Sequence, residues 1–254
     1  MPIIQSVERA LKIMDLFDEH TTELKITEIS EKMDLHKSTV HSLLKTLQEY
    51  SYINQNPENG KYRLGLKLAE RGNLVISNMD ISKVARNYLL ALSEKTGQTV
   101  HLGILDGNEG VYIDKVEGKQ SIIRYSRIGR RLPLHSTAIG KALLAYQTPA
   151  VILQLLQGYP YQHQTPSTIT NEAVFRKEIE KIQQQGYAID DQENEQGVRC
   201  AAVPIFNGKG QVLAALSIST LVSRVSDQEL ETFIKLLKTA CQELSELMKY
   251  GYEV

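Results

Sequence analysis

Residues 25–64, KITEISEKMDLHKSTVHSLLKTLQEYSYINQNPENGKYRL, decide the fold of the first part of the chain. A short helical pattern over residues 26–33 stops at Asp34-Leu35, and a second helix is predicted from Lys37 onward. The dense turn signal at residues 56–60 then separates two strand-like pieces. This order predicts a helix-turn-helix followed by a two-stranded wing. In that arrangement the second helix enters the DNA major groove.

The second predicted helix has one apolar side and one polar side. Its apolar residues recur at helical spacing, and the opposite side carries small or basic donors that reach phosphates and base edges. The predicted base contacts are Ser38, Thr39, His41 and Ser42, and the predicted phosphate contacts are Lys37 and Lys45. Thr27, expected to cap the preceding helix, and Lys61 and Arg63 on the return strand complete the predicted DNA-binding set. The competing interpretation is a solvated helix face beside an ordinary surface hairpin.

The composition bounds the class of protein. A length of 254 residues with 42% hydrophobic residues is sufficient for one or two packed domains. The formal net charge of -1 argues against a dedicated nonspecific nucleic-acid binder, so either the charge is distributed unevenly or the affinity is gained by dimerisation; residues 37–67 are locally richer in Lys and Arg than in acids. Two cysteines form no disulfide framework and suit a reducing cytoplasm. We expect no signal peptide and no membrane span, hence a cytoplasmic protein.

The rest of the chain predicts a second, larger domain. A linker helix is predicted over residues 66–76, and a helix beginning at Asp80 is expected to end at Gly97. Strand patterns follow at residues 99–105, 110–116 and 121–126, then helices, then strands at 187–191, 198–206 and 212–220, and a last helix from Asp227. The predicted fold is α+β. Its second domain holds a six-stranded mixed sheet flanked by helices.

Several polar residues of this second domain are candidates for a ligand site. Residues 136–141 run from a loop into a helix, whose free backbone N–H groups favour an anion such as a carboxylate. Ser136 or Thr137 is equally well explained as the helix cap. Ser217 and Ser219 lie two apart on a strand and so face the same side, although both hydroxyls could instead bond locally to backbone. Asp190 and Cys200, taken alone, are more often a surface acid and a small core residue.

The sequence resembles the IclR family of bacterial transcription regulators over nearly its whole length. The first domain carries this resemblance at residues 6–11, 26–29, 37–40 and 62–65, and the second at 186–187, 190–191, 193, 197–200, 204–205 and 216–219. His41-Ser42 stands where the family often has a Tyr-Arg pair, which leaves the base contacts open. The resemblance implies three parts: a winged helix-turn-helix over residues 1–65, a linker helix over 66–79, and a GAF-like effector-binding domain over 80–254.

The resemblance also implies a small-molecule pocket. Its predicted residues are Ser136, Thr137, Ala138, Ile139, Gly140, Asp190, Cys200, Ser217 and Ser219. Within the family, residues 101–103, 111–113, 125–131 and 133–141 are similar to the 2-keto-3-deoxygluconate repressors. That similarity implies a sugar-acid effector. Positive charge is added nearby in sequence by Arg124, Arg127, Arg130 and Arg131, at least two of which are better explained as a basic surface or a subunit contact. No cofactor and no metal are expected.

Two other classes of protein compete with the regulator. An enzyme would need a group of catalytic or metal-binding residues, and the best candidate is a metal site formed by His135, Cys200 and Asp190. No His-x-x-x-His, Cys-x-x-Cys or Gly-x-Ser-x-Gly spacing occurs in the sequence. A sensor that binds ligand and partner protein but not DNA is the other. The sequence favours a ligand-controlled repressor of a carbon-catabolic operon, not an enzyme. Its expected partners are palindromic operator DNA, an effector, and further copies of itself as a homodimer or a dimer of dimers (homotetramer).

Overall fold

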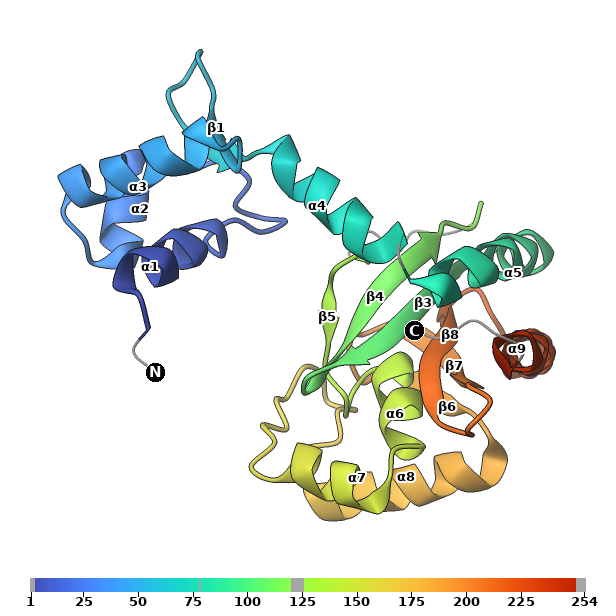
Figure 1. The fold of residues 1–254 in the computed structure, drawn as a ribbon. Coiled ribbons are helices and arrows are strands. Elements are labelled where there is room, and N and C mark those ends of the chain that lie inside the picture. The colour runs from blue at the N-terminus through green and yellow to red at the C-terminus, as the bar shows by residue number, and fades with distance from the viewer. Residues whose placement is uncertain (1–2, 78, 120–125, 250–254) are drawn as a thin grey trace. The chain divides into compact units, whose positions relative to one another are not determined.

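The computed structural model describes residues 3–77, 79–119 and 126–249. By its internal contacts the chain divides into two compact units, Met1–Asn78 and Met79–Val254. The first unit contains α1 (Gln5–Met14), α2 (Ile26–Met33), α3 (Lys37–Glu49), β1 (Ile53–Gln55), β2 (Tyr62–Leu64) and α4 (Leu66–Ser77) (Figure 1). The predicted helix-turn-helix and wing are therefore confirmed.

Local chemistry explains how the first unit turns at two points. The backbone at Asp34 is left-handed, with φ of 50° and ψ of 50°, and it ends α2 before α3 begins. Gly65 ends the wing, where a Cβ atom would lie 2.1 Å from the carbonyl oxygen of Ser51. The expectation that Thr27 caps α2 is wrong. The helix already begins at Ile26, and its first turn is closed by the Glu28 carboxylate, which accepts from the Lys25 N–H at 2.6 Å.

The second unit begins with α5 (Asp80–Thr96), which ends at Gly97 in the expected left-handed conformation (φ of 69°). The strands are β3 (Thr99–Asp106), β4 (Glu109–Val116), β5 (Arg131–Leu132), β6 (Ala188–Asp191), β7 (Val198–Phe206) and β8 (Val212–Leu221). The remaining helices are α6 (Ala138–Ala145), α7 (Pro149–Leu156), α8 (Glu172–Gln185) and α9 (Asp227–Lys249).

These strands form one six-stranded sheet in the order β5-β4-β3-β8-β7-β6, and every described pairing is antiparallel. The predicted number of strands is correct and the prediction of a mixed sheet is wrong. Two consecutive strands joined by a helical crossover form a parallel pair only if they are neighbours in the sheet. Here the helical segment α6–α8 leads from β5 at one edge to β6 at the opposite edge. The expected strand at residues 121–126 falls on residues that, apart from Ser126, lie outside the described part.

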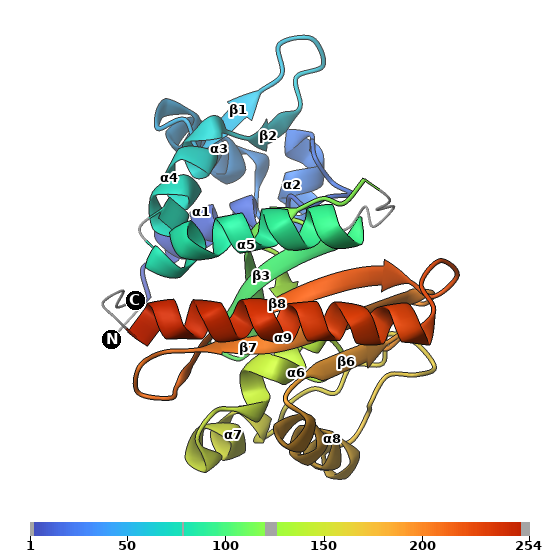
Figure 2. The same ribbon diagram turned by 90° about the vertical axis from the view of Figure 1, so that its right-hand side faces the viewer.

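Helices cover both faces of the sheet (Figures 1 and 2), and an apolar core lies on each face. On one face α5 and α9 pack on residues such as Leu102, Val203 and Leu216. On the other face α6 packs against the sheet and α7 and α8 pack around it, with small residues such as Ala202 and Ala215 beneath them. The second face therefore carries small side chains at the centre of the sheet. That is where a polar cavity lies.

Candidate functional site

Strand alternation directs a set of polar side chains toward α6. Successive residues of a strand point to opposite faces. On β8, Leu216 and Ile218 belong to the core under α5 and α9, so Ser217 and Ser219 face α6. His101 on β3 pairs with Ser217, and Cys200 on β7 pairs with Ser219. Three neighbouring strands thus bring these side chains to one place.

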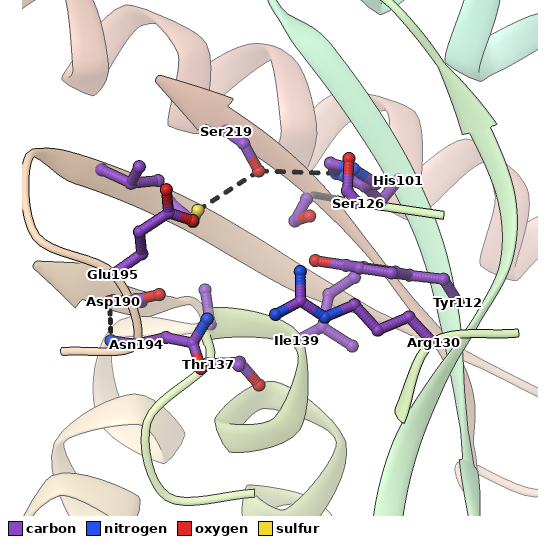
Figure 3. A pocket seen from close by; sticks show the side chains of 14 residues that line it. His101, Tyr112, Ser126, Arg130, Thr137, Ile139, Asp190, Asn194, Glu195 and Ser219 are labelled. Carbon is purple, nitrogen blue, oxygen red and sulfur yellow. Dashed lines mark hydrogen bonds between the residues drawn. The ribbon is translucent and has the colours of Figure 1, made fainter. Parts of the chain in front are cut away.

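The polar side chains line a cavity between the sheet and the start of α6, called here the sheet–α6 cavity (Figure 3). Its free volume is about 30 Å³, close to the share of a single water molecule in the liquid and far below the roughly 300 Å³ of ordinary ligand pockets. A larger ligand therefore requires its lining side chains to move. The lining residues are His101, Tyr112, Ser126, Arg130, Thr137, Ala138, Ile139, Asp190, Asn194, Glu195, Val198, Cys200, Ser217 and Ser219.

A hydrogen-bond chain crosses the strand side of the cavity (Figure 3). The Cys200 thiol donates to Ser219 Oγ at 3.2 Å, and Ser219 Oγ lies 3.4 Å from His101 Nδ1. The His101 ring stacks on Tyr112 with ring centroids 4.4 Å apart. Burial lowers the pKa of His101 to about 3 and raises the pKa values of the Cys200 thiol and the Tyr112 phenol. At neutral pH the three groups are therefore uncharged donors or acceptors, and the thiol is no nucleophile.

The start of α6 supplies backbone donors to the same cavity. Thr137 is the cap of the helix, as the competing interpretation held, and its Oγ1 accepts from the Gly140 N–H at 3.1 Å. The N–H groups of Ala138 and Ile139 precede the first intrahelical bond and find no acceptor among the described residues. Both residues line the cavity. The positive end of the helix dipole and two free N–H groups suit a carboxylate.

Asp190 adds an acid whose charge depends on pH. Burial raises its pKa to about 7, although its Oδ1 accepts from the N–H groups of Glu193 and Asn194. The neighbouring Glu193 carboxylate accepts from the fully buried Lys141 ammonium at 2.6 Å, and Glu178 lies 3.5 Å from the same ammonium. The cavity therefore adjoins a buried cluster of ionisable groups.

Seven of the nine predicted effector residues line the sheet–α6 cavity, and Ser136 and Gly140 do not. Gly140 is needed for packing, because a Cβ there would lie 2.5 Å from the Pro133 carbonyl oxygen. The prediction of the site missed five polar lining residues: His101, Tyr112, Ser126, Asn194 and Glu195; Arg130, which also lines the cavity, was named only as a source of positive charge near the effector. One signal for His101 was present, because it stands between the apolar Val100 and Leu102 on a buried strand.

The residues His135, Cys200 and Asp190, which the enzyme alternative required as a metal site, do not come together. Both ring nitrogens of His135 are engaged, by the Tyr159 hydroxyl at 3.3 Å and the Gln162 carbonyl at 3.0 Å. His135 lies outside the lining of the cavity that contains Asp190 and Cys200. Across the described ranges, no group of three or more His, Cys, Asp or Glu side chains could hold a metal ion.

The first unit presents its predicted DNA contacts on the surface of α3. Val40, Leu44 and Leu47 are buried, which orients the opposite side outward. Five of the six DNA contacts predicted on this helix are exposed: Lys37, Ser38, His41, Ser42 and Lys45. The sixth, Thr39, is half-buried. The Ser42 hydroxyl donates to the Ser38 carbonyl at 3.0 Å, so a base contact from it requires this bond to be shared or exchanged. Thr27 and Lys61 are half-buried, and Arg63 is exposed on β2.

The wing is held by an acid that the sequence prediction missed. The Glu23 carboxylate accepts from the side-chain amides of Asn56 at 3.2 Å and Asn59 at 2.9 Å, and lies 3.9 Å from the Arg63 guanidinium. These bonds lower the pKa of Glu23. The turn of the wing is thereby ordered with Arg63 on its return strand.

Two family descriptions match the sequence in the order of the two units. "IclR helix-turn-helix domain" matches residues 6–57, and "Bacterial transcriptional regulator IclR C-terminal" matches residues 73–246. The chain belongs to the IclR family. The resemblance seen in the sequence is confirmed, and this IclR protein is a ligand-responsive transcription regulator and not an enzyme.

Similar proteins support this assignment over the whole length. The HTH-type transcriptional regulator XynR of Escherichia coli K12 is 58% identical, covering 98% of this chain and 99% of XynR. KdgR of the same organism is 39% identical, covering 97% of this chain and 94% of KdgR. The expected similarity to the 2-keto-3-deoxygluconate repressors is confirmed, yet XynR is a different regulator with higher identity, so the effector does not follow from similarity.

Solved structures agree in fold. The IclR of Thermotoga maritima superposes with a TM-score of 0.80 at 36% identity, covering 97% of this chain and 99% of that chain. The C-terminal domain of E. coli KdgR superposes with a TM-score of 0.62 at 40% identity, covering 68% of this chain and all of that domain. Regulators of the family bind operator DNA and effectors and form oligomers. No helix in the described part of this IclR protein is long and apolar enough to cross a membrane.

Proposed function

We propose that this protein represses a carbon-catabolic operon and senses a small organic or sugar acid, such as 2-keto-3-deoxygluconate, in the sheet–α6 cavity. The observation that carries the ligand class is the concentration of donors in one enclosed space. Free N–H groups of α6, serine hydroxyls and the side chain of Arg130 line it together. A carboxylate with several oxygens satisfies such groups better than an apolar ligand does.

The proposed division of labour follows the two units. Residues 1–65 read DNA, residues 66–79 link, and residues 80–254 form a GAF-like effector domain. Lys37 and Lys45 contact phosphates, and Ser38, Thr39, His41 and Ser42 meet base edges from the exposed side of α3. Thr27, Lys61 and Arg63 contact the DNA backbone. The operator is palindromic because the protein acts in the cytoplasm as a homodimer or dimer of dimers, whose symmetry the DNA mirrors.

The proposed switch is a shift between two states of the effector domain. A sugar acid exceeds the 30 Å³ that is free in the cavity, so it stabilises a state in which the lining has opened. Ligand binding shifts the population toward that state by its difference in affinity for the two. The linker helix then changes the spacing of the two DNA-reading helices in the dimer. Equal operator affinity with and without saturating ligand would contradict this mechanism.

The experiment is fluorescence anisotropy on DNA from upstream of the gene, with and without 2-keto-3-deoxygluconate and a panel of other sugar acids. Operator binding that one of these acids changes supports the proposal. Operator binding that none of them changes retains the regulator and refutes the ligand class. A protein that binds no site in a genome-wide binding assay refutes the DNA role.

Two serine variants test whether the effector binds in the sheet–α6 cavity. Ser217→Val removes a hydroxyl that lines the cavity, and Ser136→Ala removes one that is equally buried but outside the lining. We expect Ser217→Val to weaken the response to effector about tenfold, the effect of about 1.4 kcal/mol from one lost hydrogen bond. Ser136→Ala should respond like the wild type, because the Ser136 hydroxyl has no hydrogen-bond partner in the part of the chain that the structure describes.

A further inference from the structure

One nitrogen in the sheet–α6 cavity has no partner. His101 is 1% exposed, and its Nε2 atom makes no hydrogen bond to any described residue. Ser126 Oγ, which lines the same cavity, is also buried and has no hydrogen-bond partner within the described ranges. Most buried polar groups in folded proteins are hydrogen-bonded, so an orphaned one inside a cavity marks a position for an outside partner, either an ordered water or a ligand atom that replaces it.

The hydrogen-bond chain favours one of the two neutral tautomers of His101, because the 3.4 Å contact between Ser219 Oγ and His101 Nδ1 leaves the donor to be assigned from the surrounding bonds. The Cys200 thiol donates to Ser219 Oγ, and the hydroxyl proton of Ser219 needs its own acceptor in this buried place. Among the described residues, the bonded neighbour able to accept it is His101 Nδ1, at 3.4 Å. A neutral imidazole whose Nδ1 accepts holds its proton on Nε2. Burial keeps the ring neutral, with a pKa of about 3. The orphaned atom is therefore an N–H donor.

The ring is fixed before any ligand arrives. His101 lies in the middle of β3, paired with both β4 and β8, and its ring stacks on Tyr112 at an interplanar angle of 21°. A donor held by strand pairing and ring stacking is preorganised, and so loses little entropy when it binds. His101 comes from β3 of the sheet, and Ile139 comes from α6 on the other side of the cavity (Figure 3). The N–H groups of Ala138 and Ile139, which find no acceptor among the described residues, belong to this start of α6. The cavity thus offers hydrogen-bond donors at two separate places, one on the sheet and one at the start of α6.

We infer that His101 is the specificity-determining residue of the cavity, donating from Nε2 to a hydroxyl oxygen on the tail of an acid whose carboxylate lies at the start of α6. The inference rests on the proposed function, since it assumes that the cavity binds an acid. It adds the requirement for a second oxygen several bonds from the carboxylate. Sugar acids meet this requirement, and simple keto acids with an alkyl tail do not.

Two substitutions of His101 separate its two nitrogens. In His101→Asn the short amide places its oxygen near the position of Nδ1, where it serves Ser219, and its NH₂ group does not reach the position of Nε2. In His101→Gln the longer amide places an NH₂ group near the position of Nε2. Isothermal titration calorimetry would compare 2-keto-3-deoxygluconate with 2-ketohexanoate, which has the same head and chain length but no hydroxyls.

We expect His101→Asn to weaken binding of 2-keto-3-deoxygluconate about tenfold, and His101→Gln to stay within about threefold of the wild type. Affinity for 2-ketohexanoate should change less than about twofold in either variant, since its tail offers no acceptor. A loss of affinity by misfolding would instead weaken both acids equally. Wild-type affinity of His101→Asn for 2-keto-3-deoxygluconate would overturn the assignment of His101 and leave the proposed function standing.

Nitrogen-15 NMR of the wild-type imidazole supplies a test that needs no variant. We expect the Nε2–H tautomer in the free protein and a change at Nε2 when 2-keto-3-deoxygluconate binds. A ring protonated at Nδ1 would overturn the inference. If the wild-type protein binds neither acid nor any other sugar acid of the panel, the ligand class itself fails and the role of His101 fails with it, an outcome distinct from a variant that binds normally.

Discussion

The buried ammonium of Lys141 provides a quantitative test of how the effector domain is held together. Its side chain is 0% exposed and lies 2.6 Å from a Glu193 oxygen and 3.5 Å from a Glu178 oxygen. Lys141→Met keeps the length and apolar stem of the side chain while removing the charge. Two carboxylates, which are 11% and 17% exposed, then lose their common counter-ion.

The magnitude follows from the two distances. At an effective dielectric constant of about 20, the two pairs attract by roughly 6 and 5 kcal/mol. Much of this is offset because methionine, unlike an ammonium, is buried without loss of hydration. Removal of one partner from a buried pair typically costs about 3–5 kcal/mol. We therefore expect Lys141→Met to lower the free energy of unfolding by about 4 kcal/mol and the melting temperature by roughly 8–16 °C.

The loss must depend on pH, and its sign can be worked out. Burial raises the pKa of Glu193 even with Lys141 present, and removal of the ammonium raises it further. An acid whose pKa is raised on folding favours the folded state at low pH and loses that contribution as pH rises through the folded pKa. The destabilisation by Lys141→Met should therefore be smaller at pH 5.5 than at pH 7.5.

The assay is urea unfolding followed by circular dichroism at 222 nm at both pH values. Lys181→Met is the matched control, because Lys181 also pairs with Glu178, at 3.8 Å, but is 63% exposed; it should cost less than about 1 kcal/mol. A Lys141→Met protein within about 1 kcal/mol of the wild type, or equally destabilised at both pH values, would refute the reasoning.

Three further predictions concern packing, DNA and effector binding. Gly140→Ala should destabilise the effector domain by about 1–3 kcal/mol in thermal unfolding, because its Cβ meets backbone atoms at 2.5 and 2.7 Å. Lys37→Ala combined with Lys45→Ala should weaken operator binding and reduce the slope of log affinity against log salt concentration by about 2. Binding of an acid effector should tighten as pH falls from 8 to 6, since Asp190, with a pKa of about 7, then becomes neutral and no longer repels the carboxylate.

Each of these three predictions has a control variant or a result that would contradict it. Gly72→Ala in α4, where nothing lies within 4 Å of the new Cβ, should be neutral or stabilising, and equal effects at both glycines would contradict the packing argument. Lys209→Ala, on the β7–β8 turn, should leave the salt slope unchanged. Asp190→Asn should abolish the pH dependence of effector binding; its persistence in that variant would assign the titration to another group.

The sequence by itself determined the local structure of the DNA-reading unit. The stripe of Val40, Leu44 and Leu47 fixes which side of α3 is buried, and the turn residues before β2 fix the wing. These patterns involve neighbours along the chain, so periodicity and turn chemistry are sufficient to predict them. The same holds for the paired orientation of Ser217 and Ser219, which strand alternation dictates.

Only the tertiary structure decided how the sheet pairs and what completes the cavity. Strand patterns do not state their partners, so the antiparallel order and the short strand β5 could not be read from them. His101 is distant in sequence from Ser219, and their contact depends on the pairing of β3 with β8. The exclusion of Ser136 and Gly140 from the cavity has the same cause. A residue in a loop entering a helix faces the ligand or the core according to the sheet beneath it, which the local sequence does not contain.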